Sequence, residues 1–426
     1  MPPTAPLNGA DLAWMMTSTA LVLLMIPALG FFYGGMVGTK NVLNTILMSF
    51  ATLAYCLVAW AVVGYSLAFS PGTVVIGDLR WAFLRGVDLT ASHPLGPSIP
   101  HVIYMAFQAT FAIITTALVS GAIVSRMRIK AYLLFITLWI IAVYGPIAHW
   151  VWGGGWLGKL GALDFAGGTV VHVNAGLAAL AAALVLGNRT NYGRQAFLPG
   201  NVPYTLLGAG VLWFGWFGFN GGSAVASNQF AALAFANTFL APGACAVVWS
   251  LLDLLRTGKV TAIGVASGIV VGLVVITPAS GFVPPIWGLV MGAIGALPSY
   301  YVILWRARTR IDESLDVFAA HGVGGATGAI LTGVFAVKAW NGLQDGLIAG
   351  NPNQVLIQVV SVFAAAAYSF IATFALLKIV GALTPLRASV HEEALGMDPT
   401  QHGEEAYTTG EGAILVLHDG GTEAKA

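Results

Sequence analysis

The chain has 426 residues, of which 58% are hydrophobic and only 8% are charged, and its formal net charge is +1. Soluble domains contain about 25% charged residues, so this composition and a mean hydropathy of +0.83 exclude an ordinary water-exposed surface. The near-zero net charge also offers no strongly basic surface, and we expect no nucleic-acid partner. We therefore predict an all-α polytopic membrane protein.

Apolar runs long enough to cross a bilayer, about 20 residues each, recur along the chain as far as residue 380. The start, "MPPTAPLNGADLAW", lacks the basic region of a signal peptide, so we expect the first run to remain as a span. The eleven expected transmembrane helices cover 11–34, 41–69, 101–124, 131–150, 164–187, 202–220, 229–255, 260–278, 284–305, 316–337 and 353–380. Residues 1–380 then form one membrane domain, and residues 381–426 form a cytoplasmic tail.

Lysine and arginine are unequally divided between the loops on the two sides of these spans. With the N-terminus outside, the outer loops hold Arg80, Arg85, Lys159 and Lys338. The inner loops then hold Lys40, Arg126, Arg128, Lys130, Arg189, Arg194, Arg256, Lys259, Arg306, Arg308 and Arg310. Cytoplasmic loops carry an excess of these residues, so we predict a multi-pass protein with its N-terminus outside and its C-terminus in the cytoplasm.

Two related segments carry ionisable residues inside otherwise apolar spans. "DFAGGTVVHVNAG" in the fifth span places Asp164 before His172, and "DVFAAHGVGGATG" in the tenth places Asp316 before His321. The topology gives these spans opposite directions, which predicts an inverted repeat of spans 1–5 and 6–10 with a site between the halves.

The two histidines are expected to meet near the middle of the bilayer. A helix rises 1.5 Å per residue, which places His172 about 12 Å inward of Asp164 and His321 about 7.5 Å outward of Asp316. An ionisable residue at that depth points to function and needs a partner. In the alternative interpretation, each histidine only bonds a neighbouring helix. Both aspartates occupy helix N-cap positions, so capping alone accounts for them.

Aromatic residues are concentrated in three further stretches. "AFQATFAIITTAL", "HWVWGGGW" and "FGWFGFNGGSA" contain Phe107, Phe111, Trp150, Trp152, Trp156, Trp216, Phe219 and Ser223. Tryptophans near a membrane boundary usually belong to an interfacial belt. Together, however, these residues offer ring faces for a desolvated cation beside a hydroxyl that accepts hydrogen bonds.

The combined motifs resemble the ammonium transporters, the Amt branch of the Amt/Mep/Rh superfamily. The resemblance covers nearly the whole chain, from "GFFYGGMVGTKNVLN" through "PIAHWVWGGGWLGKLGALDFAGGTVVHVNAGLAALAAALVLGNR" to "GMDPTQHGEEAY". It implies recruitment of ammonium at an outer site, deprotonation of the cation and conduction of ammonia through a hydrophobic pore. It further implies electrogenic transport, with the proton relayed separately.

The resemblance also implies a role for each matching residue. The recruitment site is Phe107, Trp152 and Ser223 shaped by Asp164, the gate is Phe111 and Phe219, and the pore is lined by His172, His321 and Trp216. The pairing of Trp152 with Ser223 favours the Amt branch over the Rh branch. The implied protein is a homotrimer in the plasma or inner membrane, with a PII-type signal protein as a partner at its cytoplasmic face.

Alternative functions remain open at this point. An Amt-like sensor binds ammonium with little flux, and a Rh-like channel conducts a neutral gas. An intramembrane metalloenzyme is disfavoured because no H-E-x-x-H motif is present, and we expect neither an enzyme, a metal nor a cofactor. Cys56 and Cys245 lie in apolar runs, where packing explains them. The outer loop 71–100 matches no motif.

Overall fold

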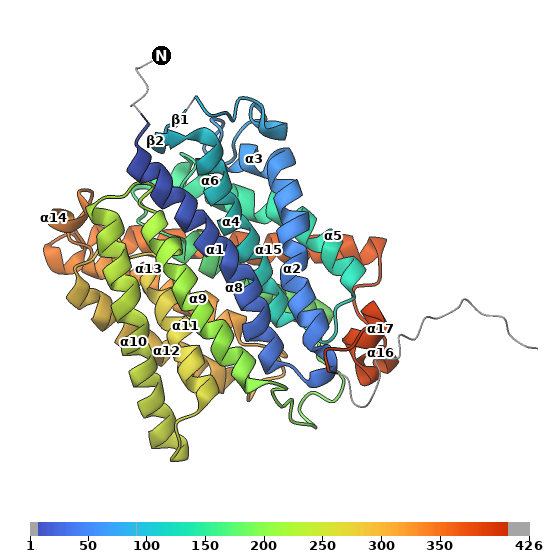
Figure 1. Ribbon diagram of the computed structural model, residues 1–426. Coiled ribbons are helices and arrows are strands. Elements are labelled where there is room, and N and C mark those ends of the chain that lie inside the picture. Colours follow the sequence, from blue (N-terminus) through green and yellow to red (C-terminus); the bar gives the residue numbers. More distant parts are fainter. Residues whose placement is uncertain (1–6, 91, 408–426) are drawn as a thin grey trace, which may run out of the picture.

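The computed structural model describes residues 7–90 and 92–407 (Figure 1). Within these residues, 10 helical segments are long and apolar enough to cross a membrane. They are Gly9–Met36, Thr39–Phe69, His101–Ala122, Ile129–Leu160, Gly168–Leu186, Val202–Gly222, Gln229–Thr257, Pro285–Arg306, Phe318–Phe335 and Asn353–Leu383. The predicted class, an all-α polytopic membrane protein, is confirmed. The part of the predicted tail that follows residue 407 lies outside the described residues.

The described residues of the first half form eight α-helices and a small hairpin of strands. The helices are α1 (Gly9–Met36), α2 (Val42–Ala59), α3 (Tyr65–Phe69), α4 (His101–Val119), α5 (Ile129–Trp139), α6 (Gly145–Val151), α7 (Trp156–Leu160) and α8 (Asn174–Leu186). The antiparallel strands are β1 (Ser92–His93) and β2 (Gly96–Pro100). The π-helical segments η2 (Trp60–Gly64) and η5 (Ile140–Tyr144) interrupt long helices, and η6 (Gly168–Val173) begins the helix that continues as α8.

As far as residue 407, where the description of the structure ends, the regular structure of the second half is helical. Its helices are α9 (Val202–Gly222), α10 (Gln229–Thr257), α11 (Ala262–Ile276), α12 (Pro285–Arg306), α13 (Gly324–Phe335), α14 (Lys338–Asn341), α15 (Asn353–Leu383), α16 (Val390–Leu395) and α17 (Met397–His402). The π-helical segment η7 (Phe318–Val323) leads directly into α13. Short 3-10 turns occur in both halves. They are η1 (Thr39–Asn41), η3 (Ala82–Leu84) and η4 (Ser120–Ala122) in the first half and η8 (Leu347–Ala349) in the second.

The span expected at 260–278 is shorter than the others. Its helix α11 has 15 residues, fewer than the roughly 20 needed to cross the hydrocarbon core. The helix ends at Ile276, just before Pro278, which cannot donate a main-chain hydrogen bond. Turns then lead to Pro285, where α12 begins. The count of eleven spans therefore stays a prediction.

Helices α1 and α9 lie against each other along much of their length (Figure 1). Glycines of α9 make this approach possible, because a methyl group at Gly208 would meet the main chain of Phe32 and one at Gly215 would meet Met25. Small residues bring helix backbones together in lipid, where no hydrophobic effect drives the association. This packing holds the N-terminal helices of the two halves together.

Two opposite faces of the bundle can be told apart by their connections. On the N-terminal face, where α1 begins, Asn8 N donates to Ser98 O of β2 at 2.8 Å. On the C-terminal face, α16 and α17 pack beside the start of α2 (Figure 1). There Asp398 accepts hydrogen bonds from Leu43 N at 3.0 Å and Asn44 N at 2.8 Å, so α17 caps α2.

The tail follows the C-terminal face as far as it is described. Glu393 of α16 accepts hydrogen bonds from Thr190 N at 2.9 Å and from Arg387 at 2.6 Å. In the "HGEEAY" stretch, Tyr407 OH accepts a hydrogen bond from Asn201 Nδ2 at 3.0 Å. These contacts attach the tail to the loop before α9 as well as to α2.

Large apolar side chains cover the outside of the bundle. Examples are Val58 of α2, Phe239 and Leu255 of α10, and Phe363 and Ile371 of α15, each more than half exposed. Such a surface is unusual for a monomer in water, but it suits a helix bundle whose surroundings are lipid. The two cysteines, Cys56 and Cys245, are buried and unpaired.

Candidate functional site

The two π-helical segments that carry the predicted histidines cross in opposite directions inside the bundle. A methyl group at Gly176 would meet the main chain of Gly322, and one at Gly325 would meet Gly168 O and the His172 side chain. Because residue numbers rise along one segment as they fall along the other, the segments are antiparallel. These contacts depend on glycine, since any larger residue would push the segments apart.

The crossing brings the side chains of His172 and His321 together. Their Nδ1 atoms lie 3.2 Å apart, and the rings are 1% and 4% exposed. A hydrogen bond between two imidazole nitrogens needs one N–H donor and one bare acceptor. Among the described residues, His172 Nε2 has no hydrogen-bond partner, so the pair offers an unused nitrogen to a small molecule.

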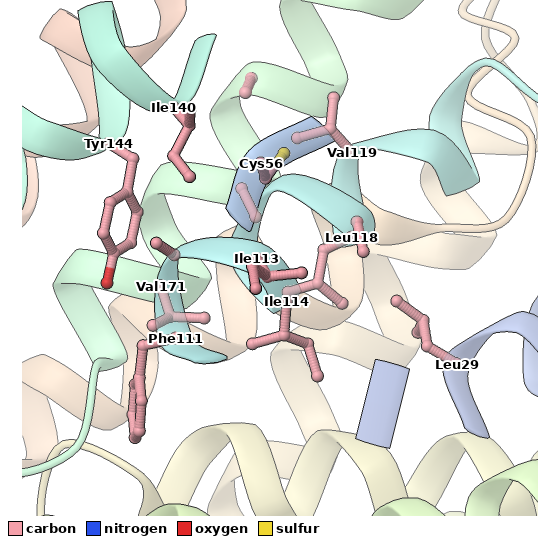
Figure 2. Close-up of a cluster of buried hydrophobic side chains, with 14 of the residues drawn as sticks. Leu29, Cys56, Phe111, Ile113, Ile114, Leu118, Val119, Ile140, Tyr144 and Val171 are labelled. Atoms are coloured by element: carbon pink, nitrogen blue, oxygen red, sulfur yellow. The ribbon is translucent and has the colours of Figure 1, made fainter. Parts of the chain in front are cut away.

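The histidine pair faces a narrow apolar lumen of about 10 Å³. Its lining is Met25, Leu29, Phe32, Ile114, Leu118, Val171, His172, Leu212, Trp216, Phe219, Val270 and His321. Figure 2 shows Ile114 and Leu118 of α4 reaching toward Leu29 of α1 in this region. Its volume matches the smallest cavity that holds one water, about 10–15 Å³, so the lumen fits single small molecules.

Two phenyl rings in contact with each other, those of Phe111 and Phe219, separate this lumen from the N-terminal face. The ring centroids of Phe111 and Phe219 lie 4.2 Å apart with an interplanar angle of 32°, and both side chains are 1% exposed. Phe219 stacks on His172 at 6.0 Å, and Phe111 meets the Trp152 ring edge to face at 5.9 Å. An unbroken series of rings therefore connects Trp152 to the histidines.

A vestibule of about 470 Å³ opens on the other side of these rings. Trp152, Asp164, Ser223, Gln108 and Phe111 are among the residues that line it. The Ser223 hydroxyl donates to Phe219 O at 2.9 Å, so its oxygen keeps its lone pairs for another donor. The vestibule thus combines an aromatic face with hydrogen-bond acceptors beside the entrance to the lumen.

Asp164 acts as the cap of the π-helical segment η6. Its Oδ1 accepts hydrogen bonds from Gly167 N and Gly168 N at 2.8 and 2.7 Å. Its Oδ2 accepts from Thr169 N and Val170 N at 2.8 and 3.1 Å. Four main-chain amides therefore hold this carboxylate, and the capping interpretation from the sequence is confirmed by the geometry.

The capping role expected for Asp316 is wrong. Asp316 instead forms an ion pair with Arg306, Oδ1 to Nε at 2.7 Å. Glu313 takes the amide, because its Oε2 accepts a hydrogen bond from Phe318 N at 3.2 Å. Asp316 has a φ of 59°, a left-handed conformation that turns its side chain toward the end of α12 rather than over the start of η7.

The remaining aromatic residues occupy different places. Phe107 is 1% exposed and packs on Phe111 with ring centroids 4.9 Å apart, behind the lining of the vestibule. Trp216 lines the lumen, stacks on His172 at 5.5 Å and donates its indole N–H to Thr277 Oγ1 at 2.9 Å. Trp150 lies outside both cavities and bonds the main chain of Val75.

Two residues of the site have no counterpart among the sequence predictions. Gln108 lines the vestibule, and its buried Oε1 accepts no hydrogen bond from the part of the chain that the structure describes. Thr277 orients the Trp216 ring over the lumen. Gln108 is detectable in principle, because a polar residue directly after Phe107 interrupts an apolar span. Thr277 gives no such signal, since hydroxyl groups at helix ends are common.

A bundle of membrane-crossing helices that encloses a narrow apolar lumen, closed by aromatic rings beneath a vestibule, defines a membrane channel or transporter. The family described as the Ammonium Transporter Family matches residues 13–407. The chain belongs to this family, and the predicted recognition is confirmed. The family and the relatives are transporters, so the expectation that the chain is not an enzyme is confirmed as well.

Individual relatives are similar over nearly their whole length. The chain is 47% identical to an ammonium transporter of Bacillus subtilis, over 93% of this chain and 98% of the relative. It is 42% identical to the ammonium transporter Amt1 of Archaeoglobus fulgidus, over 94% and 100%. The crystal structure of Candida albicans Mep2 matches with a TM-score of 0.86 at 34% identity, over 91% of this chain and 88% of that one. A structure described as a sensor Amt protein matches with a TM-score of 0.84 at 29% identity, over 91% and 97%.

Proposed function

We propose that the chain moves ammonium across a membrane by recruiting the cation in the vestibule and conducting ammonia through the lumen. One observation carries the proposal: the Nδ1 atoms of His172 and His321 lie 3.2 Å apart inside an otherwise apolar lumen. Membership of the ammonium transporter family supports the choice of substrate.

Recruitment uses the aromatic face of Trp152 and the free acceptor of Ser223. A cation held over an indole ring is attracted by the negative ring face, and ammonium also has N–H groups to donate. The Ser223 oxygen accepts one of them, since its own hydrogen is already given to Phe219 O. Phe107 supports the site by packing on Phe111, and Asp164 shapes it by fixing the start of η6.

Selectivity arises at the gate of Phe111 and Phe219. Potassium has the same charge as ammonium and a similar size, but it has no proton to lose. A bare cation in the narrow apolar lumen would bear an uncompensated cost of desolvation. Neutral ammonia passes instead, after the cation releases its proton near the rings.

Within residues 7–90 and 92–407, the histidine pair gives ammonia the only free polar contact in the lining of the lumen. If one Nδ1 donates to the other, one ring keeps a free Nε2 acceptor and the other a free Nε2–H donor. Ammonia both donates and accepts, so it matches this pair, and Trp216 closes the apolar wall beside it. The released proton crosses separately with the histidines in its relay, which makes transport electrogenic.

The orientation follows from the positions of the basic residues. Arg126, Arg189, Arg306 and Arg387 belong to the C-terminal face, in contact with the 312–316 loop or with the tail. The positive-inside rule makes this face cytoplasmic, so the N-terminal face with its vestibule is outside. We place the protein in the plasma or inner membrane as a homotrimer, with residues 381–407 as a cytoplasmic tail that a PII-type signal protein contacts.

Sensing is a second candidate function, because the fold also matches the structure described as a sensor Amt protein. A sensor needs the vestibule but little flux. The two functions are separated by measuring whether purified protein in vesicles accelerates ammonium entry at all.

The proposal is tested by following the internal pH of proteoliposomes after an ammonium pulse. Replacing Ser223 by alanine removes an acceptor in the vestibule and is expected to raise the half-saturating ammonium concentration. Ser250→Ala is the matched control, because that hydroxyl donates only to Ala246 O within α10. Equal half-saturation in both variants and the parent contradicts recruitment at Ser223.

A further inference from the structure

Three successive carbonyl groups of the loop after α3 accept hydrogen bonds from the segment that carries Trp152. We call these carbonyls, of residues 73–75, the carbonyl bracket. The pairs are Thr73 O with His149 Nε2 at 2.9 Å, Val74 O with Trp156 N at 3.0 Å, and Val75 O with Trp150 Nε1 at 2.8 Å. The loop for which the sequence shows no motif is thus attached on both sides of Trp152.

His149 is held from two directions. Its Nε2 faces Thr73 O at 2.9 Å, and its Nδ1 faces Ala68 O at 3.0 Å, while the side chain is 1% exposed. A carbonyl oxygen only accepts hydrogen bonds, and a neutral imidazole has one N–H. One ring nitrogen therefore donates to its carbonyl, and the contact of the other nitrogen with the second carbonyl fixes the orientation of the ring.

Two glycines let the loop and the segment approach so closely. A methyl group at Gly153 would meet Ala68 O and the His149 ring, and one at Gly155 would meet His149 O and Val74 O. At Val74 O, the carbonyl bracket therefore meets the main chain of the turn after α6 directly. A displacement of the loop that carries the carbonyl bracket therefore also displaces the turn after α6, and the reverse holds as well.

The same turn fixes Trp152. Its main-chain N donates to Ala148 O at 2.8 Å, and Gly153 N donates to His149 O at 3.1 Å. The turn that carries Trp152 is therefore hydrogen-bonded to His149, whose side chain contacts the bracket. On the other side, the indole N–H of Trp152 donates to Asp164 O at 2.9 Å. The ring that faces the vestibule is therefore supported by α6 and the bracket at its main chain and by Asp164 at its edge.

We propose that His149 and the carbonyl bracket position the Trp152 ring in the vestibule, and that this is the function of the loop after α3. His149 and Trp150 are positioning residues, because they act through Trp152 and line neither cavity. The effect on transport rests on the proposed role of Trp152 in recruiting ammonium.

The test compares His149→Gln and Trp150→Phe with the parent in proteoliposomes, by the ammonium-evoked current over a range of concentrations. Trp150→Phe removes one N–H donor and keeps an aromatic ring. Loss of one hydrogen bond is expected to raise the half-saturating concentration about threefold to tenfold, with the maximal current retained. Trp156→Phe is the matched control, since Trp156 bonds the bracket through its main chain and should leave half-saturation unchanged.

The same substitutions are repeated in a Trp152→Leu background. If His149 and Trp150 act through Trp152, they add no further shift there. An equal shift in both backgrounds, or a fall in maximal current alone, overturns the proposal, because either result shows an effect that bypasses Trp152.

A cryo-EM map of the His149→Gln protein tests the positioning without reference to transport. The expected result is a Trp152 ring displaced from Asp164 O, and an unmoved ring overturns the inference. If Trp152→Leu alone leaves half-saturation unchanged, the proposed role in recruitment fails, while the map still decides whether His149 positions the ring.

Discussion

Replacing Asp164 by asparagine separates two roles that a carboxylate at the vestibule can have. Asparagine is nearly the same size but has one acceptor oxygen instead of two. In the parent protein, the two carboxylate oxygens of Asp164 accept hydrogen bonds from four main-chain N–H groups. In the variant, the amide NH₂ group replaces one oxygen and faces the N–H groups of two residues, either Thr169 and Val170 or Gly167 and Gly168.

The size of the effect follows from these bonds. A buried N–H group that loses its acceptor costs about 1–3 kcal/mol, so two of them cost about 2–6 kcal/mol. The strain falls on η6, whose fifth residue is His172. We therefore expect Asp164→Asn to lower both the melting temperature and the maximal transport rate, because the histidine pair loses its geometry.

The assay measures the apparent melting temperature in detergent at one scan rate and the concentration dependence of ammonium transport in vesicles. Asp78→Asn is the control, because that carboxylate lies on the surface and pairs with Arg80, an interaction that contributes about 0–1 kcal/mol. An Asp164→Asn protein with unchanged melting temperature and only a raised half-saturating concentration would refute the capping role and make Asp164 a direct ligand.

Two further predictions concern stability. Burial, and then the nearby Asp316, raise the pKa of the Glu313 carboxyl to about 7. The protonated carboxyl therefore stabilises the folded state fully below pH about 4.5, the ordinary pKa of glutamate. This contribution to the free energy of unfolding, up to about 3 kcal/mol, is lost as the pH rises through 7. Melting curves at pH 5 and pH 8 should therefore show a smaller loss for Glu313→Gln than for the parent; equal losses would contradict this. Gly176→Ala, which drives a methyl group into Gly322, should destabilise by about 1–3 kcal/mol and slow transport. Gly210→Ala is its control, with nothing within 4 Å of the added group, and equal melting temperatures for the two variants would count against the close crossing.

Composition and hydropathy predict most of the fold because lipid imposes a simple length rule on helices. The span expected at 284–305 is observed as the helix Pro285–Arg306, so each predicted end lies within one residue of the observed end. The rule fails at α11, where Pro278 ends the helix early and the following turns complete the segment. The π-helical segments at His172 and His321 also give no periodic signal, so their shape could not be read from the sequence.

The candidate site was predictable to different degrees. The repeated Asp and His pattern indicated that His172 and His321 meet, and the structure places them in contact. The same pattern misled for Asp316, because Arg306 competes for its carboxylate and no local rule ranks an ion pair above a cap. The carbonyl bracket could not be predicted from the sequence, because main-chain acceptors such as Thr73 O have no sequence signature.

The most direct test of the central claim is the current that an ammonium pulse evokes across proteoliposomes at fixed pH, with potassium and a His172→Ala variant alongside. Conduction through the gate and the histidine pair predicts a saturable current for ammonium, none for potassium, and an altered response in the variant. Equal currents for ammonium and potassium, or a His172→Ala response identical to the parent's, would contradict passage through this lumen.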